Sequence, residues 1–142
     1  MTLKRIGIAI MATLLASPAF AQLLPGFGKQ LTEAQAKEAL LGIDMRGHSP
    51  TLGFSWRECI QPNGETLYET PHEVLRGRLL IAPGGEACFS YEDDGYRDIA
   101  CFTAHRTAEG LRFQTEGPAP IVFLATKIVT GVKSCHPRDL IG

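Results

Sequence analysis

The placement of two cysteines constrains the fold of this chain more than any other feature of its sequence. Cys88 and Cys101 stand at equal distances from the dipeptide Asp94-Gly95, a strong signal for a two-residue β-hairpin turn. With that turn, the two cysteines face each other in a non-hydrogen-bonded pair, where side chains approach closely enough for a disulfide. A turn centred on Asp93-Asp94 would instead place Cys88 opposite Ile99.

The remaining cysteines, Cys59 and Cys135, are expected to form a second disulfide. Four cysteines permit three pairings, and their spacing alone does not choose among them. The hairpin geometry favours Cys88–Cys101 and leaves Cys59–Cys135, which would tie an early strand to the C-terminal end of the domain. Closing so long a loop is worth about 4 kcal/mol, because it reduces the entropy of the unfolded chain.

Residues 1–21 have the features of a secretory signal peptide. Lys4 and Arg5 give a positive start, residues 6–15 are apolar, and Ala19-Phe20-Ala21 forms an A-x-A cleavage signal. The apolar run is shorter than the roughly 20 residues needed to cross a bilayer, and no later stretch is suited to a membrane helix. We therefore expect cleavage near Ala21, no membrane anchor, and a periplasmic or secreted bacterial protein in a compartment where disulfides form.

The net charge argues against a nucleic-acid partner. Without the two basic residues of the leader, 12 Lys and Arg oppose 15 Asp and Glu, a net charge of −3 with neutral His. A mildly acidic chain is a poor candidate for binding nucleic acid or for polybasic attachment to a membrane surface. The hydrophobic content of 44% is typical of a chain with a packed core.

One short helix is expected near the start of the domain. Residues 22–31 are interrupted by proline and glycine and predict a flexible lead-in. Thr32 and Gln35 match a capping box, and residues 33–41 have an apolar helical face. We divide the chain into a leader (1–21), a lead-in (22–31), a single disulfide-stapled domain (32–135) and a tail (136–142).

After an expected loop at 44–50, short strands alternate with turns. The turn segments are rich in Gly, Pro, Asn and Asp, and the strands carry alternating apolar residues. On the cysteine hairpin, a second face gathers Ala87, Phe89, Ala100 and Phe102 as a core face. The predicted fold is a small, mainly β antiparallel barrel or sandwich of about seven strands, at 52–57, 66–69, 74–81, 87–91, 97–105, 111–115 and 121–130.

The sequence contains no catalytic, cofactor or metal signature. None of the four histidines has metal-ligand spacing, and neither a nucleophile elbow nor a phosphate-binding loop is present. We interpret His48, His72 and His136 as loop residues and His105 as the end of a strand. We therefore expect no cofactor, no metal site and no catalytic residue.

The tetrad Trp56-Arg57-Glu58-Cys59 is the most distinctive local pattern. Glu58 falls on the same strand face as Trp56. Its carboxylate could be a buried partner of Arg76 or Arg78, or it could line a ligand cavity. The favoured interpretation is an ion pair at the rim. The candidate ligand or rim residues are Trp56, Glu58, Tyr68 and Arg78.

Five short segments form a recognisable set: Trp56-Arg57-Glu58-Cys59, Asn63-Gly64-Glu65-Thr66-Leu67-Tyr68, Gly77-Arg78-Leu79, Cys88-Phe89-Ser90-Tyr91 and Cys101-Phe102. Over about residues 33–135, this set resembles small exported proteobacterial proteins of unknown function that carry W-x-E-C, G-x-[WL] and C-F-x-Y. The resemblance implies a small disulfide-stapled β domain and no activity. A fainter similarity is to periplasmic lysozyme inhibitors, whose S-G-x-x-Y motif is absent from this chain.

The function expected from these observations is that of an exported, non-enzymatic binding module. Its partner would be an envelope protein, a glycan or a small ligand, recognised at the mouth or rim of a β-barrel. A small hydrolase or metal-dependent envelope enzyme with scattered site residues is the first alternative, and a lysozyme-inhibitor-like protein is another. An enzyme would need a cleft where Glu58 meets an Arg and a His or Asp.

Overall fold

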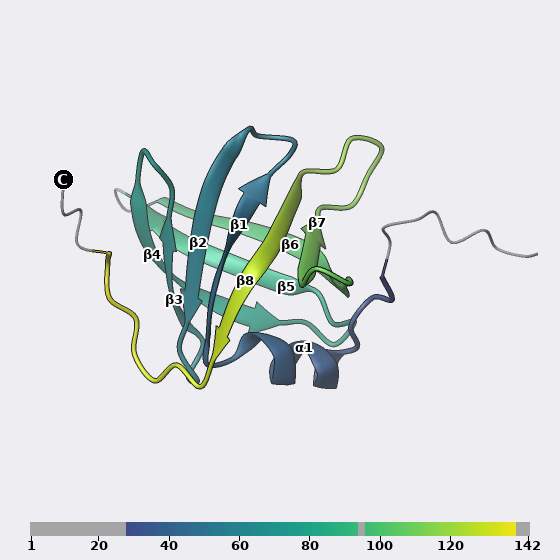
Figure 1. Cartoon of the computed structure of the whole chain (residues 1–142), viewed down its shortest axis with the longest axis horizontal. Helices are drawn as coiled ribbons and strands as arrows, with labels where there is room; N and C mark the ends of the chain where they lie inside the picture. The colour runs from purple at the N-terminus through teal and green to yellow at the C-terminus, as the bar shows by residue number, and fades with distance from the viewer. Residues whose placement is uncertain (1–27, 94–95, 139–142) are drawn as a thin grey trace, which may run out of the picture.

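The computed structural model describes residues 28–93 and 96–138 and shows a closed β-barrel with one helix (Figure 1). Eight antiparallel strands pair in sequence order, and the last pairs with the first to close the barrel. The mainly β prediction is confirmed, and the architecture is a barrel. The elements are α1 (Glu33–Leu40), β1 (Ile43–Ser49), β2 (Phe54–Ile60), β3 (Glu65–Glu69), β4 (Val74–Ile81), β5 (Ala87–Asp93), β6 (Tyr96–Arg106), β7 (Leu111–Gln114) and β8 (Val122–Thr130).

Strand β1 occupies a segment expected to be a loop, so the barrel has eight strands where about seven were expected. Ile43 and Met45 are buried, and the residue between them is less so, which is the alternation of a strand. Gly47 interrupts that pattern, because glycine has no side chain and is uncommon inside strands. A Cβ at Gly47 would lie 1.6 Å from the carbonyl oxygen of Leu124 on β8, so only glycine allows this approach. His48, expected in a loop, belongs to this strand.

Helix α1 begins at the predicted capping box. The Gln35 backbone N–H donates to Thr32 Oγ1 at 3.3 Å, and the Thr32 N–H donates to Gln35 Oε1 at 3.0 Å. Ala36 and Leu40 are fully buried and pack into the core that also contains Ile60 of β2. The helix therefore covers one end of the barrel, the lower end in Figure 1.

The chain leading into α1 is attached to the barrel. Leu31 is buried, and its backbone N–H donates to the carbonyl oxygen of Ala104 at 2.8 Å. Gln30 forms a bridge with His105. The end of the expected lead-in is thus part of the folded domain, while the expected leader lies outside the described residues.

Both predicted disulfides are confirmed. Cys88 on β5 lies directly opposite Cys101 on β6, with Cα atoms 4.0 Å apart. The register continues to Asp93 opposite Tyr96, as a turn centred on Asp94-Gly95 requires, and that dipeptide lies outside the described residues. A turn one residue earlier is excluded by this register.

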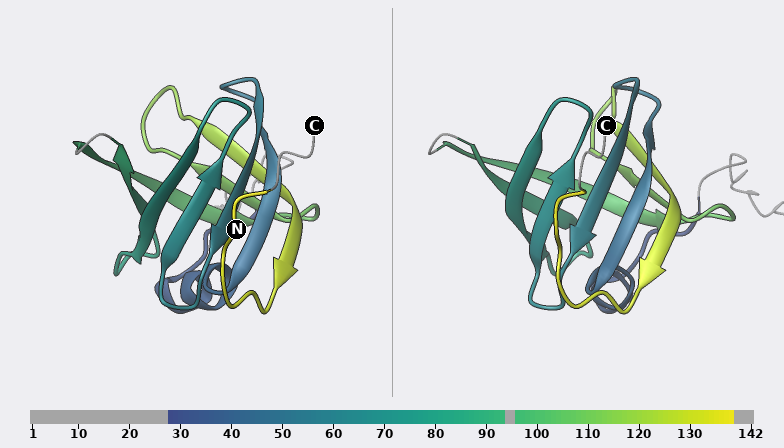
Figure 2. Two further views of the ribbon diagram at one scale, coloured as in Figure 1. Left: turned by 90° about the vertical axis from the view of Figure 1, so that its left-hand side faces the viewer. Right: turned by 60° about the vertical axis from the view of Figure 1, so that its left-hand side comes forward.

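The second disulfide joins Cys59 on β2 to Cys135, with Cα atoms 5.7 Å apart. Residues 131–138, here called the C-terminal strap, run over the outer face of the barrel at β2 and β3 (Figure 2). Cys59, Cys135 and Leu67 form a small apolar cluster between strap and wall. The strap thereby buries outward-facing residues of β2 and β3.

A buried ion-pair cluster around Arg57 fastens the strap. The guanidinium donates to Asp44 Oδ2 at 2.6 Å, to the Glu69 carboxylate, and to the carbonyl oxygen of His136 at 3.0 Å. The hydrogen bonds with Asp44 raise the pKa of Arg57. Burial acts to raise the pKa of Glu69, but hydrogen bonds from Arg57 and the Arg138 backbone prevail and lower it. The pair of Arg57 and Glu69 is therefore charged, and the cluster joins four separate segments: β1, β2, β3 and the strap.

Candidate ligand cavity inside the barrel

The barrel contains a cavity of about 250 Å³ toward the end opposite α1. The β1–β2 and β7–β8 loops border its mouth with Leu52 and Ile121, which are 45% and 38% exposed. Leu52 was expected in a strand, but β2 begins at Phe54. The volume lies near the lower end of the range for small-molecule sites, about 300–1,000 Å³. The lining is Met45, Leu52, Trp56, Glu58, Tyr68, Phe89, Tyr91, Ala100, Phe102, Phe113, Thr115, Ile121 and Phe123.

Aromatic rings form a continuous series of contacts along the cavity. The Trp56 ring makes T-shaped contacts with Phe113 and Phe123, with ring centroids 6.5 and 5.7 Å apart. These arrangements are favourable for rings with a negative face and a positive edge. The contacts continue, with centroids 5.4–6.2 Å apart, in the order Phe123, Phe102, Phe89, Tyr91 and Tyr68.

One carboxyl group, that of Glu58, lies among these rings. Glu58 is only 3% exposed, and its Oε2 accepts a hydrogen bond from the Tyr91 hydroxyl at 2.6 Å. Its Oε1 is buried and has no hydrogen-bond partner among the described residues. Burial raises the pKa of Glu58 to about 8, although the hydroxyl groups of Tyr91 and Thr66 act to lower it. The carboxyl group is therefore mostly protonated at neutral pH.

Two tyrosines face Glu58 from neighbouring parts of the wall. Tyr68 on β3 is the direct cross-strand partner of Glu58, and Tyr91 comes from β5. Burial is the main reason that the pKa of each tyrosine is raised, and the charge of Glu58 adds to the effect. Both hydroxyl groups are neutral across the physiological pH range.

A second polar atom of the lining residues is also unpartnered. The indole Nε1 of Trp56 is buried and, within the described part of the chain, makes no hydrogen bond. Buried polar atoms in proteins usually have a partner, because leaving one unpaired costs about 1–3 kcal/mol. The cavity lining thus combines apolar walls with a carboxyl oxygen and an N–H donor that a ligand could satisfy.

Three of the four candidate residues meet at this cavity. Trp56, Glu58 and Tyr68 line it, because alternate residues of β2 and β3 face the barrel interior. The favoured interpretation of Glu58 as part of a rim ion pair is wrong. Its carboxyl group accepts a hydrogen bond from the Tyr91 hydroxyl inside the barrel. Sequence reasoning missed Tyr91, although the same alternation along β5 from the predicted core residue Phe89 would have found it.

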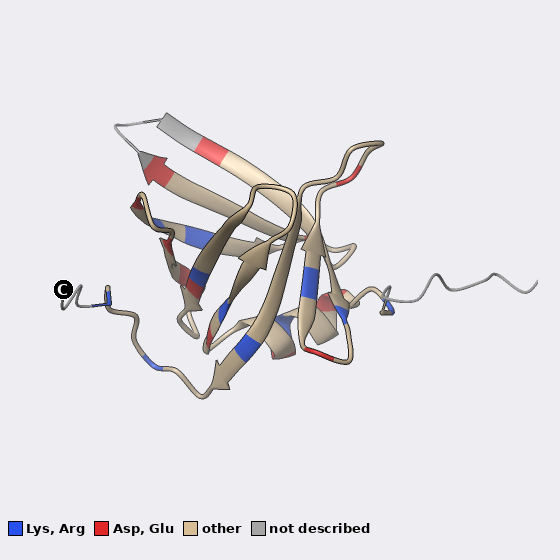
Figure 3. Ribbon diagram, turned by 45° about the horizontal axis from the view of Figure 1, so that its top comes forward, with Lys and Arg blue, Asp and Glu red and all other residues tan. Residues whose placement is uncertain are grey.

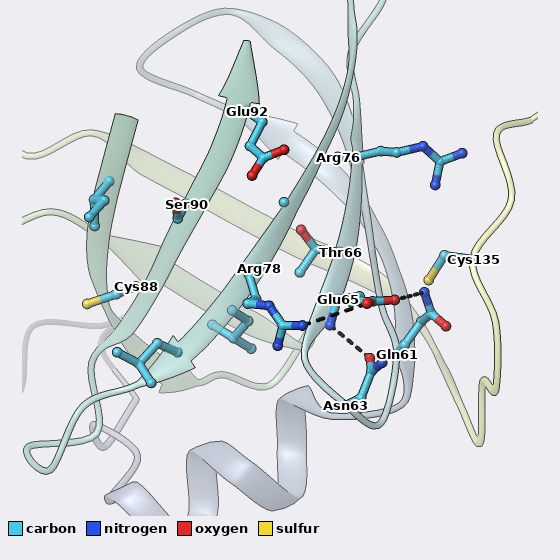
Figure 4. Close-up of a pocket in the computed structure, with 14 residues that line it drawn as sticks. Gln61, Asn63, Glu65, Thr66, Arg76, Arg78, Cys88, Ser90, Glu92 and Cys135 are labelled. Carbon is cyan, nitrogen blue, oxygen red and sulfur yellow. Dashed lines mark hydrogen bonds and ion pairs between the residues drawn. The ribbon is translucent and has the colours of Figure 1, made fainter. Parts of the chain in front are cut away.

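The fourth candidate, Arg78, lies in a separate groove on the outer face of β3, β4 and β5 (Figure 4). Its guanidinium is 3.7 Å from the Glu65 carboxylate, which also lies 3.4 Å from Gln61 Nε2. Arg76 and Glu92 line the groove farther along. Over the described residues this lining holds charges of both signs and no aromatic ring, so the interior cavity is the better candidate site.

The described surface carries mixed charge. Lys and Arg alternate with Asp and Glu along the barrel, and neither sign forms a continuous band in the view of Figure 3. Within residues 28–93 and 96–138, no three His, Cys, Asp or Glu side chains are grouped as metal ligands would be. In the same part of the chain, no helix has the length and apolar character needed to span a membrane.

Comparison of the chain with protein-family models, with curated proteins and with solved structures finds no match. The function must therefore be inferred from the cavity itself.

Proposed function

We propose that this protein is an exported, non-enzymatic binding module that holds a small, mostly apolar ligand inside its barrel. The observation that carries the proposal is a buried carboxyl group, one oxygen of which has no hydrogen-bond partner among the described residues, in a cavity walled by aromatic rings. Specific small-molecule sites have this composition, with apolar walls and a few fixed polar groups.

The chemical groups of the described cavity lining favour binding over catalysis. Acid–base or nucleophilic chemistry needs at least two cooperating groups, such as a base beside a nucleophile or a pair of carboxylates. The described lining has Glu58 and two tyrosines whose pKa values are raised, and it includes no Arg, His, Lys, Cys or Asp. Glu58 Oε1 can accept a hydrogen bond from a ligand, but the described lining holds no nucleophile or second carboxylate to act with it.

The single tryptophan of the chain provides the test. Trp56 lines the cavity, so a ligand that enters should change its fluorescence. We propose to titrate the oxidised domain with a panel of small aromatic and aliphatic compounds, and to confirm retained compounds by native mass spectrometry. Saturable one-to-one binding is expected for part of the panel.

A blocking variant and its neighbour make the test specific to the interior. Ala100→Leu adds bulk to the cavity wall, whereas Ile99→Leu changes the adjacent position on the outer surface, where the side chain is 65% exposed. Ala100→Leu should weaken binding at least about tenfold, and Ile99→Leu should leave it unchanged. Absence of binding across the panel, or equal binding by both variants, would reject the proposal.

Export is supported by the two disulfides, because such bonds persist in oxidising compartments. The experiment is to express the full chain with a C-terminal tag and to sequence the product recovered from the periplasm or medium. Cleavage after Ala21, leaving Gln22 first, is the expected result. Accumulation in the cytoplasm with Met1 intact would contradict it.

A further inference from the structure

We propose that the ligand is an organic cation, a protonated amine on an apolar or aromatic body, whose ammonium group lies against Glu58 and the surrounding rings. This inference rests on the proposed function and names the ligand class of the same cavity.

The electrostatics of the wall favour a positive ligand. The faces of aromatic rings carry negative potential and attract ammonium groups, most strongly for Trp and Tyr. Trp56, Tyr68 and Tyr91 are among the lining rings, and the one acidic side chain of the described lining is Glu58. No Lys, Arg or His belongs to that lining. A carboxylate ligand would meet an acidic side chain and aromatic rings, with no cation in the described lining to neutralise it.

The hydrogen bonding of Glu58 leaves one oxygen for the ammonium group. Oε2 already accepts from the Tyr91 hydroxyl at 2.6 Å, so Tyr91 orients the carboxyl group. Oε1 is buried and accepts no hydrogen bond from the described residues. An ammonium group is a donor without an acceptor atom, and its charge strengthens a hydrogen bond to a carboxylate oxygen. The geometry therefore supplies one charge-assisted contact and leaves the remaining ligand surface to the rings.

Binding of a cation should release a proton. In the free protein the Glu58 carboxyl group is mostly neutral at pH 7, because burial raises its pKa to about 8. The ammonium ion favours the carboxylate, so the carboxyl proton passes to solvent as the ion pair forms and the ligand keeps its own protons. The titratable groups facing Glu58 are Tyr68 and Tyr91, and Glu73 acts on Tyr68. Both tyrosines stay neutral, so Glu58 alone accounts for the released proton.

Three probes of similar size separate the chemical classes: 2-phenylethylamine, 2-phenylethanol and phenylacetate. Titration calorimetry in two buffers of different ionisation enthalpy measures both affinity and proton release. The amine should bind at least about tenfold more tightly than the alcohol and the acid, and it should release close to one proton at pH 7. Its affinity should fall about tenfold for each pH unit below 7.

The charge of Glu58 is tested by Glu58→Gln, which keeps the shape of the side chain and removes its titration. At pH 8 this variant should bind the amine at least about tenfold more weakly, and both the proton release and the pH dependence should disappear. Glu65→Gln is the matched control, since Glu65 lies in the outer groove. Near-ultraviolet circular dichroism checks that each variant is folded, and the pH profile of the native protein tests the inference without any variant.

The possible outcomes are distinguishable. If the alcohol or the acid binds as tightly as the amine, or if the amine binds without proton release, the cation inference is overturned while the binding function stands. If no probe binds, the cation inference is overturned, and the wider compound panel then decides the binding function by itself.

Discussion

Replacing Glu58 by glutamine should remove a pH dependence of folding stability that this one buried carboxyl group imposes. In the unfolded chain its pKa is near the ordinary value of 4.5, and in the folded protein burial raises it to about 8. Between these values the folded state holds one proton more than the unfolded state. The free energy of unfolding therefore falls as pH rises, which is the opposite of the effect of a carboxylate stabilised by an ion pair.

The size of the effect follows from the two pKa values. Each pH unit between them removes about 1.4 kcal/mol from the free energy of unfolding, so the loss reaches about 4 kcal/mol by pH 7.5. Because Glu58 is only 3% exposed, solvent screening does little to reduce this value. Glu58→Gln abolishes the titration in both states, so its stability relative to the native protein should rise steadily with pH.

The assay is urea unfolding of the oxidised proteins, followed by tryptophan fluorescence in one-unit steps between about pH 5 and 8. The difference in unfolding free energy between Glu58→Gln and the native protein cancels the contribution of every other titrating group. Glu65→Gln, on the outer groove, should show a nearly constant difference. A difference for Glu58→Gln that is independent of pH would refute the assignment of a neutral buried carboxyl group.

Three further predictions concern the framework, and urea unfolding measures them all. Arg57→Met leaves the buried Glu69 carboxylate and the partly buried Asp44 carboxylate with only longer ion pairs to more exposed arginines, and it should cost about 3 kcal/mol. Arg78→Met removes an exposed pair and should change stability little, so similar values for the two variants would contradict the described burial. Cys135→Ser removes the disulfide that closes a loop of 76 residues, and it should lower the free energy of unfolding by about 4.5 kcal/mol. Cys101→Ser opens a loop of 13 residues and should lower it by about 3 kcal/mol. The reverse order would count against the entropic explanation. Gly47→Ala places a Cβ 1.6 Å from a backbone oxygen of β8 and should lower the free energy of unfolding by about 2–4 kcal/mol. An unchanged urea midpoint would show that β8 can move away without penalty.

The parts of the fold that sequence reasoning predicted are those fixed by local chemistry. The dipeptide Asp94-Gly95 predicts the register of its own hairpin, and the observed register, with Asp93 opposite Tyr96, brings Cys88 and Cys101 together. The capping box at Thr32 likewise depends on residues three positions apart. In both cases the interacting groups are close in sequence, so few alternative arrangements compete with the observed one.

The missed parts depend on contacts between distant segments. The sequence predicts a loop at β1, because the reason for Gly47, the close approach of β8, lies far along the chain. Arg57 alternates with inward-facing Trp56 and Glu58, which predicts an exposed side chain, yet the C-terminal strap covers it. No local pattern shows which outer surface a tail will cover.

The candidate site was predicted in part for the same reason. Alternation placed Trp56 and Glu58 on one face, and that face is the barrel interior. Phe113 and Phe123 come from β7 and β8, and their contact with Trp56 exists only because the sheet closes. Arg78, a candidate because it could pair with Glu58, lies on the opposite face of the wall.

The closure of the barrel by its first and last strands also has a consequence for the timing of folding. The pairing of β1 with β8 joins residues separated by most of the domain, so it contributes strongly to contact order and slows folding. During synthesis, β1 cannot pair with β8 until the segment ending at Thr130 has emerged. The strap that covers β2 emerges later still. A nascent chain that still lacks β8 therefore cannot close the barrel, because β1 has no strand to pair with on that side.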